Sequence, residues 1–123
     1  MIIAAVVDQN EKILPIVDGI ILRLYDTESK QYRDYENPAL HLKKGRRGAT
    51  LRFAEEKGAS AFVAPPQTFC ELSYEKARKV GIQFYHLDEQ IVFHVFLQLI
   101  ESNQLHIKPE LSNENIEPSN VPQ

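Results

Sequence analysis

A short, continuous apolar run near the start of the chain constrains the fold more than any other feature. Residues 2–7 read IIAAVV and are followed at once by the polar DQN. A run of this kind is typical of a strand that is covered on both faces of a sheet. Two similar runs follow, SAFVA at 60–64 and IQFYHL at 82–87. These runs predict three strands in the interior of a sheet.

A hairpin is predicted between the first and second of these strands. Residues 19–26, GIILRLYD, alternate, with Ile20, Leu22 and Leu24 on one side and Arg23 and Tyr25 on the other. The polar turn TESK separates them from QYRDYE at 31–36. Period-two alternation around a polar turn is typical of a hairpin, and charges on its outer strand indicate the edge of the sheet.

Helical spacing alternates with the later strands. The first helix is predicted from about Gly45 to Gly58, where glycine can adopt the left-handed cap conformation. The second is predicted over 68–80, with Phe69, Leu72, Ala77 and Val80 near one face and Gly81 at its end.

The last helix is predicted over Asp88–Glu101, with Asp88 as its N-cap. Gln90, His94, Gln98 and Glu101 form its one polar stripe, so an apolar surface of this width needs more than one covering neighbour. Two alternatives remain for what covers this helix: the sheet of the same chain, or a second subunit.

The order of elements is strand, hairpin, helix, strand, helix, strand, helix. Alternating strands and helices predict parallel strands with right-handed crossovers, and the hairpin adds an antiparallel edge. We therefore expect an α/β fold in three layers around a mixed five-stranded sheet. From Ser102 onward the chain is rich in Pro, Asn and Glu and has no periodicity, so we expect a domain over 1–101 and a disordered tail over 102–123.

Composition excludes several classes of protein. A chain of 123 residues suits one domain, and its net charge of −3 argues against a general nucleic-acid binder. One cysteine rules out a disulfide within the chain and suits a reducing compartment. The start lacks the pattern of a signal peptide, and no stretch approaches the ~20 apolar residues that a membrane span needs. We expect a cytoplasmic protein with neither nucleic acid nor membrane as a partner.

Three short sequence segments resemble those of a known protein family. ENPA at 36–39, GATLRFAEEKGASAFVAP at 48–65 and EKARKVGIQFYHL at 75–87 resemble the dinitrogenase iron–molybdenum cofactor biosynthesis family. The resemblance covers roughly residues 1–101. It implies a ribonuclease H-like fold and the binding or carrying of nitrogenase cofactor or its precursors.

The chain departs from that family's pattern at two places. The region before the hairpin reads LPIVDGIILRLYD and lacks the family's His-Phe-Gly-Arg-like segment. The loop after the strand at 60–64 carries Pro65 and Pro66 where relatives have glycines, and proline has no N–H to offer an anion.

A ligand crevice is predicted beyond the carboxyl ends of the strands, where the strand order reverses. Asp8 and Asn10 would form one wall and the PPQTFC loop, with Gln67, the other. His86 ends a strand on the same edge. These residues are candidate cofactor contacts.

Cys70 is the central candidate. Thr68 and Glu71 have the spacing of a capping box, which would place Cys70 at the second helical position. A helix N-terminus stabilises a thiolate, the form that binds metal, but cysteine also packs as a small hydrophobe. Both alternatives remain open, and a lone cysteine precludes a four-thiolate cluster site made by this chain alone.

The other candidates are histidines and basic residues. His41 or His86 could join Cys70, because imidazole and thiolate suit the same metals, and we take Cys70 and His41 as the candidate metal ligands. KKGRRG at 43–48 places Arg46 and Arg47 at a helix start, where cations oppose the helix dipole. This cluster indicates anion binding, with a solvated basic loop as the alternative.

The leading hypothesis is a non-enzymatic carrier of an iron–sulfur or iron–molybdenum-type cofactor, with donor and acceptor proteins as partners. The alternative is a relative that has lost the ligand and acts through protein contacts or as a homodimer through 88–101. A nuclease is disfavoured because two-metal chemistry needs converging carboxylates, and the strand at 60–64 ends without an acid.

Overall fold

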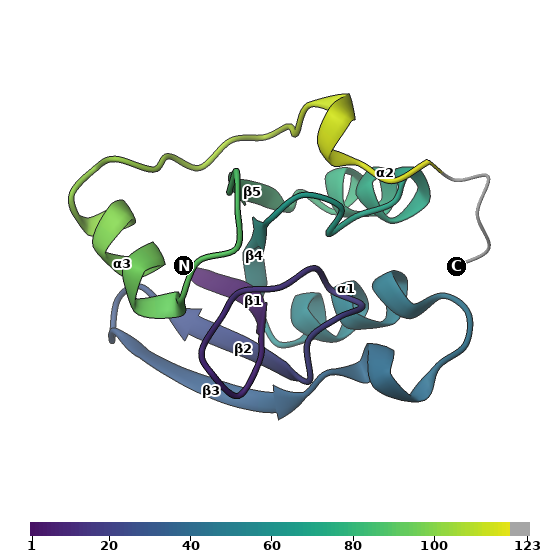
Figure 1. Ribbon diagram of the computed structural model, residues 1–123, viewed down its shortest axis with the longest axis horizontal. Helices are drawn as coiled ribbons and strands as arrows, with labels where there is room; N and C mark the ends of the chain where they lie inside the picture. Colours follow the sequence, from purple (N-terminus) through teal and green to yellow (C-terminus); the bar gives the residue numbers. More distant parts are fainter. Residues whose placement is uncertain (119–123) are drawn as a thin grey trace.

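The computed structural model describes residues 1–118 and consists of a mixed five-stranded sheet flanked by helices (Figure 1). The strand order is β3-β2-β1-β4-β5. The strands are β1 (Ile2–Val7), β2 (Ile21–Asp26), β3 (Gln31–Glu36), β4 (Ala59–Ala64) and β5 (Gln83–His86). The helices are η1 (Pro38–His41), α1 (Arg46–Glu56), α2 (Glu71–Lys79), α3 (Phe93–Glu101) and η2 (Asn113–Asn115).

The pairing of the strands confirms the predicted mixed sheet with a hairpin edge. β1 pairs with β2, and β2 with β3, in antiparallel fashion. β1 pairs with β4, and β4 with β5, in parallel. Because β1 lies in the middle, its odd and even residues face two different cores. Ala4 and Val6 pack with α1 and α2, whereas Ile3, Ala5 and Val7 pack with α3. This double covering explains the continuous apolar run at 2–7.

Arg23 is buried, although a charged residue in an alternating hairpin strand usually faces solvent. Its side chain is only 2% exposed and lies on the α3 face of β2. The guanidinium donates to both carboxylate oxygens of Asp34 at 2.8 Å and also to Glu11. It stacks over the rings of Tyr32 and Phe93, at 3.8 and 4.9 Å from their centroids. Burial alone would lower the pKa of Arg23, but these hydrogen bonds raise it above its ordinary value.

Asn37 ties the loop between β1 and β2 to α1. It is fully buried, and its amide donates to the carbonyls of Ile16 at 2.7 Å and Gly19 at 2.8 Å. Its side-chain oxygen accepts from the Thr50 hydroxyl at 2.6 Å and from the Ala39 N–H at 3.2 Å. All four polar positions of this side chain are therefore used inside the protein.

α2 begins later than predicted. Cys70, rather than Thr68, is the N-cap, and Ser73 completes a reciprocal capping box with it. Thr68 therefore stays in the preceding turn, and Cys70 lies just outside the helix instead of at its second position. Phe69 and Ala77 are buried as expected, but Leu72 and Val80 are about half exposed, so the predicted apolar face is wrong for those two.

α3 begins at Phe93, five residues after the predicted N-cap Asp88. Residues 91–93 pair instead with the loop after β1: Ile13 donates to the Ile91 carbonyl, and Phe93 to the Glu11 carbonyl, both at 2.8 Å. Phe93 and Phe96 are buried in the core on the α3 face, so the sheet of the same chain provides the main cover. None of the helices in the part of the chain described here combines the length and apolar character of a membrane span.

The predicted disorder from Ser102 does not hold for residues 102–118. Phe84 of β5 and Lys108 exchange two backbone hydrogen bonds, at 2.7 and 2.8 Å. Leu111 and Ile116 are buried in the core on the α1 and α2 face. Two well-placed apolar side chains therefore hold a segment whose average composition is typical of a disordered one. Residues 119–123, also predicted to be disordered, lie outside the described residues.

Candidate functional site

The strongest candidate site is a small hollow between the beginnings of α1 and α2. Its volume is about 80 Å³. Both helices begin at the edge where β4 ends, which is the edge predicted to carry the crevice. The lining residues, which combine cations, glycines and the cysteine, are Gly45, Arg47, Gly48, Arg52, Cys70, Leu72, Ser73 and Lys76.

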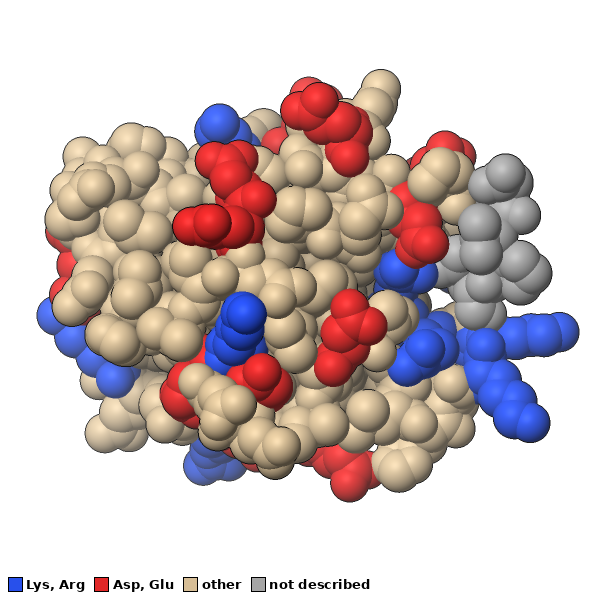
Figure 2. All heavy atoms as spheres, viewed as in Figure 1, with Lys and Arg blue, Asp and Glu red and all other residues tan. Residues whose placement is uncertain are grey.

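Positive charge dominates this hollow. Arg47 and Arg52 come from α1 and Lys76 from α2. Lys76 extends toward α1, since its Nζ lies 4.0 Å from the place that a Cβ on Gly48 would take. Among the described residues, Arg52 and Lys76 have no ion-pair partner. Figure 2 shows Lys and Arg side chains gathered at the end of the molecule where α1 begins.

The start of α1 adds to this positive potential. Its N-cap, Gly45, has a left-handed backbone with φ of 63° and makes no side-chain cap. The first turn of the helix contains no acidic residue. The positive end of the helix dipole is therefore not compensated by a carboxylate from the helix itself, which favours an anion at this place.

Arg47 is buried and connects α1 to the loop before α2. Its Nε donates to the Thr68 carbonyl at 3.1 Å. Its Nη2 donates to the Glu117 carboxylate and, at 3.5 Å, to the Gln67 carbonyl. The guanidinium thus holds the β4–α2 loop in place while lining the hollow.

Cys70 forms part of the hollow's wall with a side chain that already has a partner. It is 2% exposed, and its Sγ accepts from the Ser73 N–H at 3.4 Å and lies 3.2 Å from the Ser73 hydroxyl. Its structural role is to cap α2. This buried, structural role resembles the alternative in which Cys70 packs as a small hydrophobe. Whether the thiol also binds a ligand stays a prediction.

The other predicted contacts do not line this hollow. Asp8 accepts the N–H groups of Asn10 and Lys12, both at 2.9 Å, and so stabilises its own turn. Arg46 donates to the carbonyls of Ala39 and Val17, both at 3.0 Å, and holds loops together.

Gln67 and the two histidines lie elsewhere as well. The backbone N–H of Gln67 donates to the Asn115 carbonyl at 3.0 Å. His41 pairs with Glu36 on the exposed surface, and His86 lies 3.0 Å from an Asp88 carboxylate oxygen. The structure therefore brings Arg47 and Cys70 into one hollow but shows no contact between Cys70 and His41.

The described residues contain no group of three or more His, Cys, Asp or Glu side chains that could hold a metal ion. The chemistry of the hollow is instead that of a cationic cradle. Its cations would attract an anion by charge and hydrogen bonding, without replacing the ligands of a metal in that anion.

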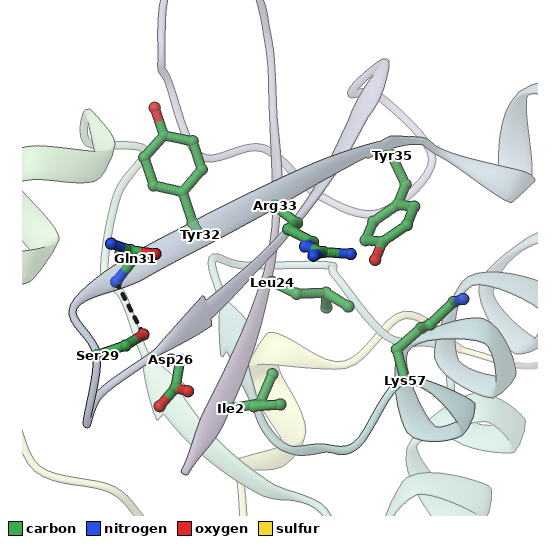
Figure 3. Close-up of a pocket in the computed structure, with 9 residues that line it drawn as sticks. All are labelled: Ile2, Leu24, Asp26, Ser29, Gln31, Tyr32, Arg33, Tyr35 and Lys57. Carbon is green, nitrogen blue, oxygen red and sulfur yellow. Dashed lines mark hydrogen bonds between the residues drawn. The ribbon is translucent and has the colours of Figure 1, made fainter.

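A larger hollow, of about 360 Å³, lies beside the hairpin and contains none of the predicted site residues (Figure 3). Ile2 and Leu24 form an apolar floor, Asp26 lies toward one end, and Arg33 and Lys57 lie toward the other. Lys57 is already placed over the Tyr35 ring, 5.5 Å from its centroid. Despite its size, this trough has charges of both signs and no helix start, so it is the weaker candidate for an anion.

Sequence reasoning missed Arg52, Lys76, Ser73 and Glu117 as neighbours of the site. Arg52 and Lys76 meet because α1 and α2 pack side by side, and a single sequence does not specify that crossing. The one available signal was the spacing of Ser73 and Lys76, which lie three residues apart on α2 and so share one face of that helix.

Comparison with known proteins shows similarity in fold. No protein-family model matches the sequence, and no curated protein matches it significantly. The structure of the apo form of the orange protein from Desulfovibrio gigas gives a TM-score of 0.73 at 13% identity, over 86% of this chain and 91% of that one. The NMR structure of a NifB-related protein of the DUF35 family from Thermotoga gives 0.66 at 16% identity, over 92% and 97%.

Proposed function

We propose that the protein is a non-catalytic binding or carrier protein for an anionic cofactor of the iron–sulfur or iron–molybdenum type. The cofactor is cargo bound against the mouth of the hollow between α1 and α2. The observation that carries this proposal is the convergence of Arg47, Arg52 and Lys76 at an uncapped helix start. Charge is the recognition element, since three cations face a site without a carboxylate among its lining residues.

The structural neighbours support this proposal. The orange protein was solved in an apo form, a term for a protein without its bound group, and the name of the Thermotoga neighbour relates it to NifB. Both agree with the sequence resemblance to a nitrogenase-cofactor family. The proposal includes the ribonuclease H-like assignment of the fold, for which the strand order β3-β2-β1-β4-β5 is the supporting observation.

The residues present fit an anion held by charge better than a cluster ligated by the chain. Cys70 is a single thiol that already caps α2, and His41 pairs with Glu36. Iron bound only by protein side chains would need more ligands than these. We therefore propose that the cofactor arrives with its own inorganic ligands and that Arg47, Arg52 and Lys76 neutralise its charge.

The proposal extends to partners. A carrier needs proteins that supply and accept its cargo. A homodimer through α3 remains a second candidate mode of action, supported by the partial exposure of Val95 and Leu99 on a helix that buries Phe93 and Phe96. Size measurement in solution tests it: a dimer that dissociates in Leu99→Glu supports this interface, and a monomeric wild type contradicts it.

Anaerobic cofactor uptake tests the proposal. The purified protein is offered a reconstituted iron–sulfur cluster or iron–molybdenum cofactor, and visible absorbance that co-elutes with it is measured. We expect Lys76→Gln to retain at most about a third of the bound cofactor at low salt, because it removes one of three cations facing the site.

Lys79→Gln is the matched control. Lys79 is also exposed on α2, but it pairs with Glu75 and does not line the hollow. It should retain cofactor as the wild type does. Equal losses in both variants would contradict this site, and no uptake by the wild type would overturn the proposed function. A loss in Cys70→Ala without loss of folding would additionally identify the thiol as a ligand.

A further inference from the structure

The end of the described chain forms a strap, residues 108–117, that returns to the candidate site. It starts at Lys108, which pairs with Phe84, and then crosses α2, where the Leu111 N–H donates to the Tyr74 hydroxyl at 2.8 Å. In Figure 1 this segment is the yellow-green chain that leads from α3 to the start of α2. The burial of Leu111 and Ile116 fixes its course.

The last residue of the strap, Glu117, contacts two groups that could bind an anion, the Glu71 N–H and the Arg47 guanidinium. The Glu117 N–H donates to the Phe69 carbonyl at 2.9 Å, and the Glu117 carbonyl accepts the N–H of Glu71 at 3.0 Å. Glu71 is the first residue of α2. The carboxylate of Glu117 meanwhile accepts from Arg47, one of the three cations that line the hollow.

The Glu117 carboxylate is therefore an anion that the chain itself supplies. Its side chain is 29% exposed, whereas that of Arg47 is 9% exposed. Since the carboxylate is partly hydrated already, it can exchange Arg47 for water when an incoming anion takes its place on the guanidinium. The backbone contacts of Glu117 do not depend on its carboxylate, so the exchange leaves the strap in place.

We propose that Glu117 is a built-in competitor of the cargo: its carboxylate occupies Arg47 when the site is empty, and an incoming oxyanionic or sulfidic ligand displaces it. This inference rests on the proposed function, because it concerns the same site. The strap neutralises Arg47 in the absence of cargo. Return of the carboxylate to Arg47 then assists release of the cargo, and a transfer protein needs such release.

Glu110 on the same strap provides a matched control. Its carboxylate pairs with Arg78 on the exposed side of α2, and neither residue lines the hollow. Glu110→Gln and Glu117→Gln remove the same charge from the same segment. A difference between them therefore reports the contact with Arg47 rather than the net charge of the protein.

The test measures binding of inorganic phosphate at low salt by titration calorimetry, with wild type, Glu117→Gln and Glu110→Gln. We expect Glu117→Gln to bind phosphate about three- to tenfold more tightly than the wild type and Glu110→Gln to bind like the wild type. Hydrogen exchange of the Leu111 amide serves as a second measurement. Retained protection in Glu117→Gln shows that the strap stays seated.

Three results would contradict the competitor role. Equal affinities in wild type and Glu117→Gln would overturn it and leave the proposed function intact. An equal gain in Glu110→Gln would assign the effect to net charge. Loss of Leu111 protection in Glu117→Gln would show that the carboxylate holds the whole strap instead of competing locally. If no variant binds phosphate or cofactor, the proposed function itself fails, and its regulation with it.

Discussion

Arg23→Met is expected to lower the free energy of unfolding by about 2–4 kcal/mol. Methionine can fill much of the space between the rings of Tyr32 and Phe93, so packing is largely kept. The loss comes from charge, because Glu11 and Asp34 remain beside each other without the cation that both contact. The two carboxylates are partly exposed, which places the expected cost below that of a fully buried ion triad. Urea unfolding measures this loss of free energy, provided that the dependence of the free energy of unfolding on urea concentration is the same in both proteins.

Arg33→Met is the control for this prediction. Arg33 lies on β3, next to Asp34 in the chain, but it is exposed and has no ion pair among the described residues. The same substitution there should change the free energy of unfolding by less than about 0.5 kcal/mol. Similar losses at both positions would contradict the account of Arg23 as the ionic link between the hairpin and the loop after β1.

Asn37→Asp is expected to lower the free energy of unfolding by about 2–4 kcal/mol although the shape hardly changes. The amide of Asn37 donates to two buried carbonyl oxygens, those of Ile16 and Gly19. A carboxylate cannot donate to either, and its charge would face both oxygens. The loop that these carbonyls belong to also supplies the Val17 carbonyl to Arg46, so the start of α1 loses support as well.

Thr50→Val isolates the other half of this network. It removes only the hydroxyl that donates to Asn37 at 2.6 Å, and threonine and valine have nearly the same shape. We expect a cost of about 1–2 kcal/mol, clearly below that of Asn37→Asp. Chemical denaturation of both variants shows which of the two loses more free energy of unfolding. An Asn37→Asp protein as stable as the wild type would contradict the role of the amide as a donor to the loop.

The strands could be predicted from the sequence because their patterns are local. The apolar run at 2–7 encodes a strand that is covered on both faces, and the alternation at 19–26 before a polar turn encodes a strand of a hairpin. Arg23 was an exception, since its burial depends on Glu11, which is far from it in the chain and forms an ion pair only after the loop has folded. Local alternation contains no information about such a partner.

Helix starts were predicted less well than helices. Thr68 and Glu71 have the spacing of a capping box, but Cys70 and Ser73 form it instead, with a thiol in place of the usual hydroxyl. Similarly, Asp88 is a good N-cap by residue type, yet residues 91–93 pair with the loop after β1 and delay α3. A local capping box decided the start of α2, and tertiary hydrogen bonds decided the start of α3.

The candidate site was predicted in part. The edge of the sheet where the small hollow lies was predicted from strand order, and Arg47 and Cys70, which line that hollow, were predicted from the helix starts. Lys76 did not, because it reaches the hollow through the packing of α1 against α2. Glu117 did not either, since the composition after Ser102 indicated disorder, whereas Leu111 and Ile116 anchor that segment in the core.

The most direct test of the account is the location of ligand-induced shifts in amide NMR spectra. The protein is titrated under anaerobic conditions with the anionic cofactor, or with inorganic phosphate as a simpler probe. We expect the largest shifts at residues 45–48 and 70–76, which surround the small hollow, and only small shifts around the hairpin at 31–35. Shifts concentrated at the hairpin hollow, or no saturable shifts with either ligand, would contradict an anion site between α1 and α2.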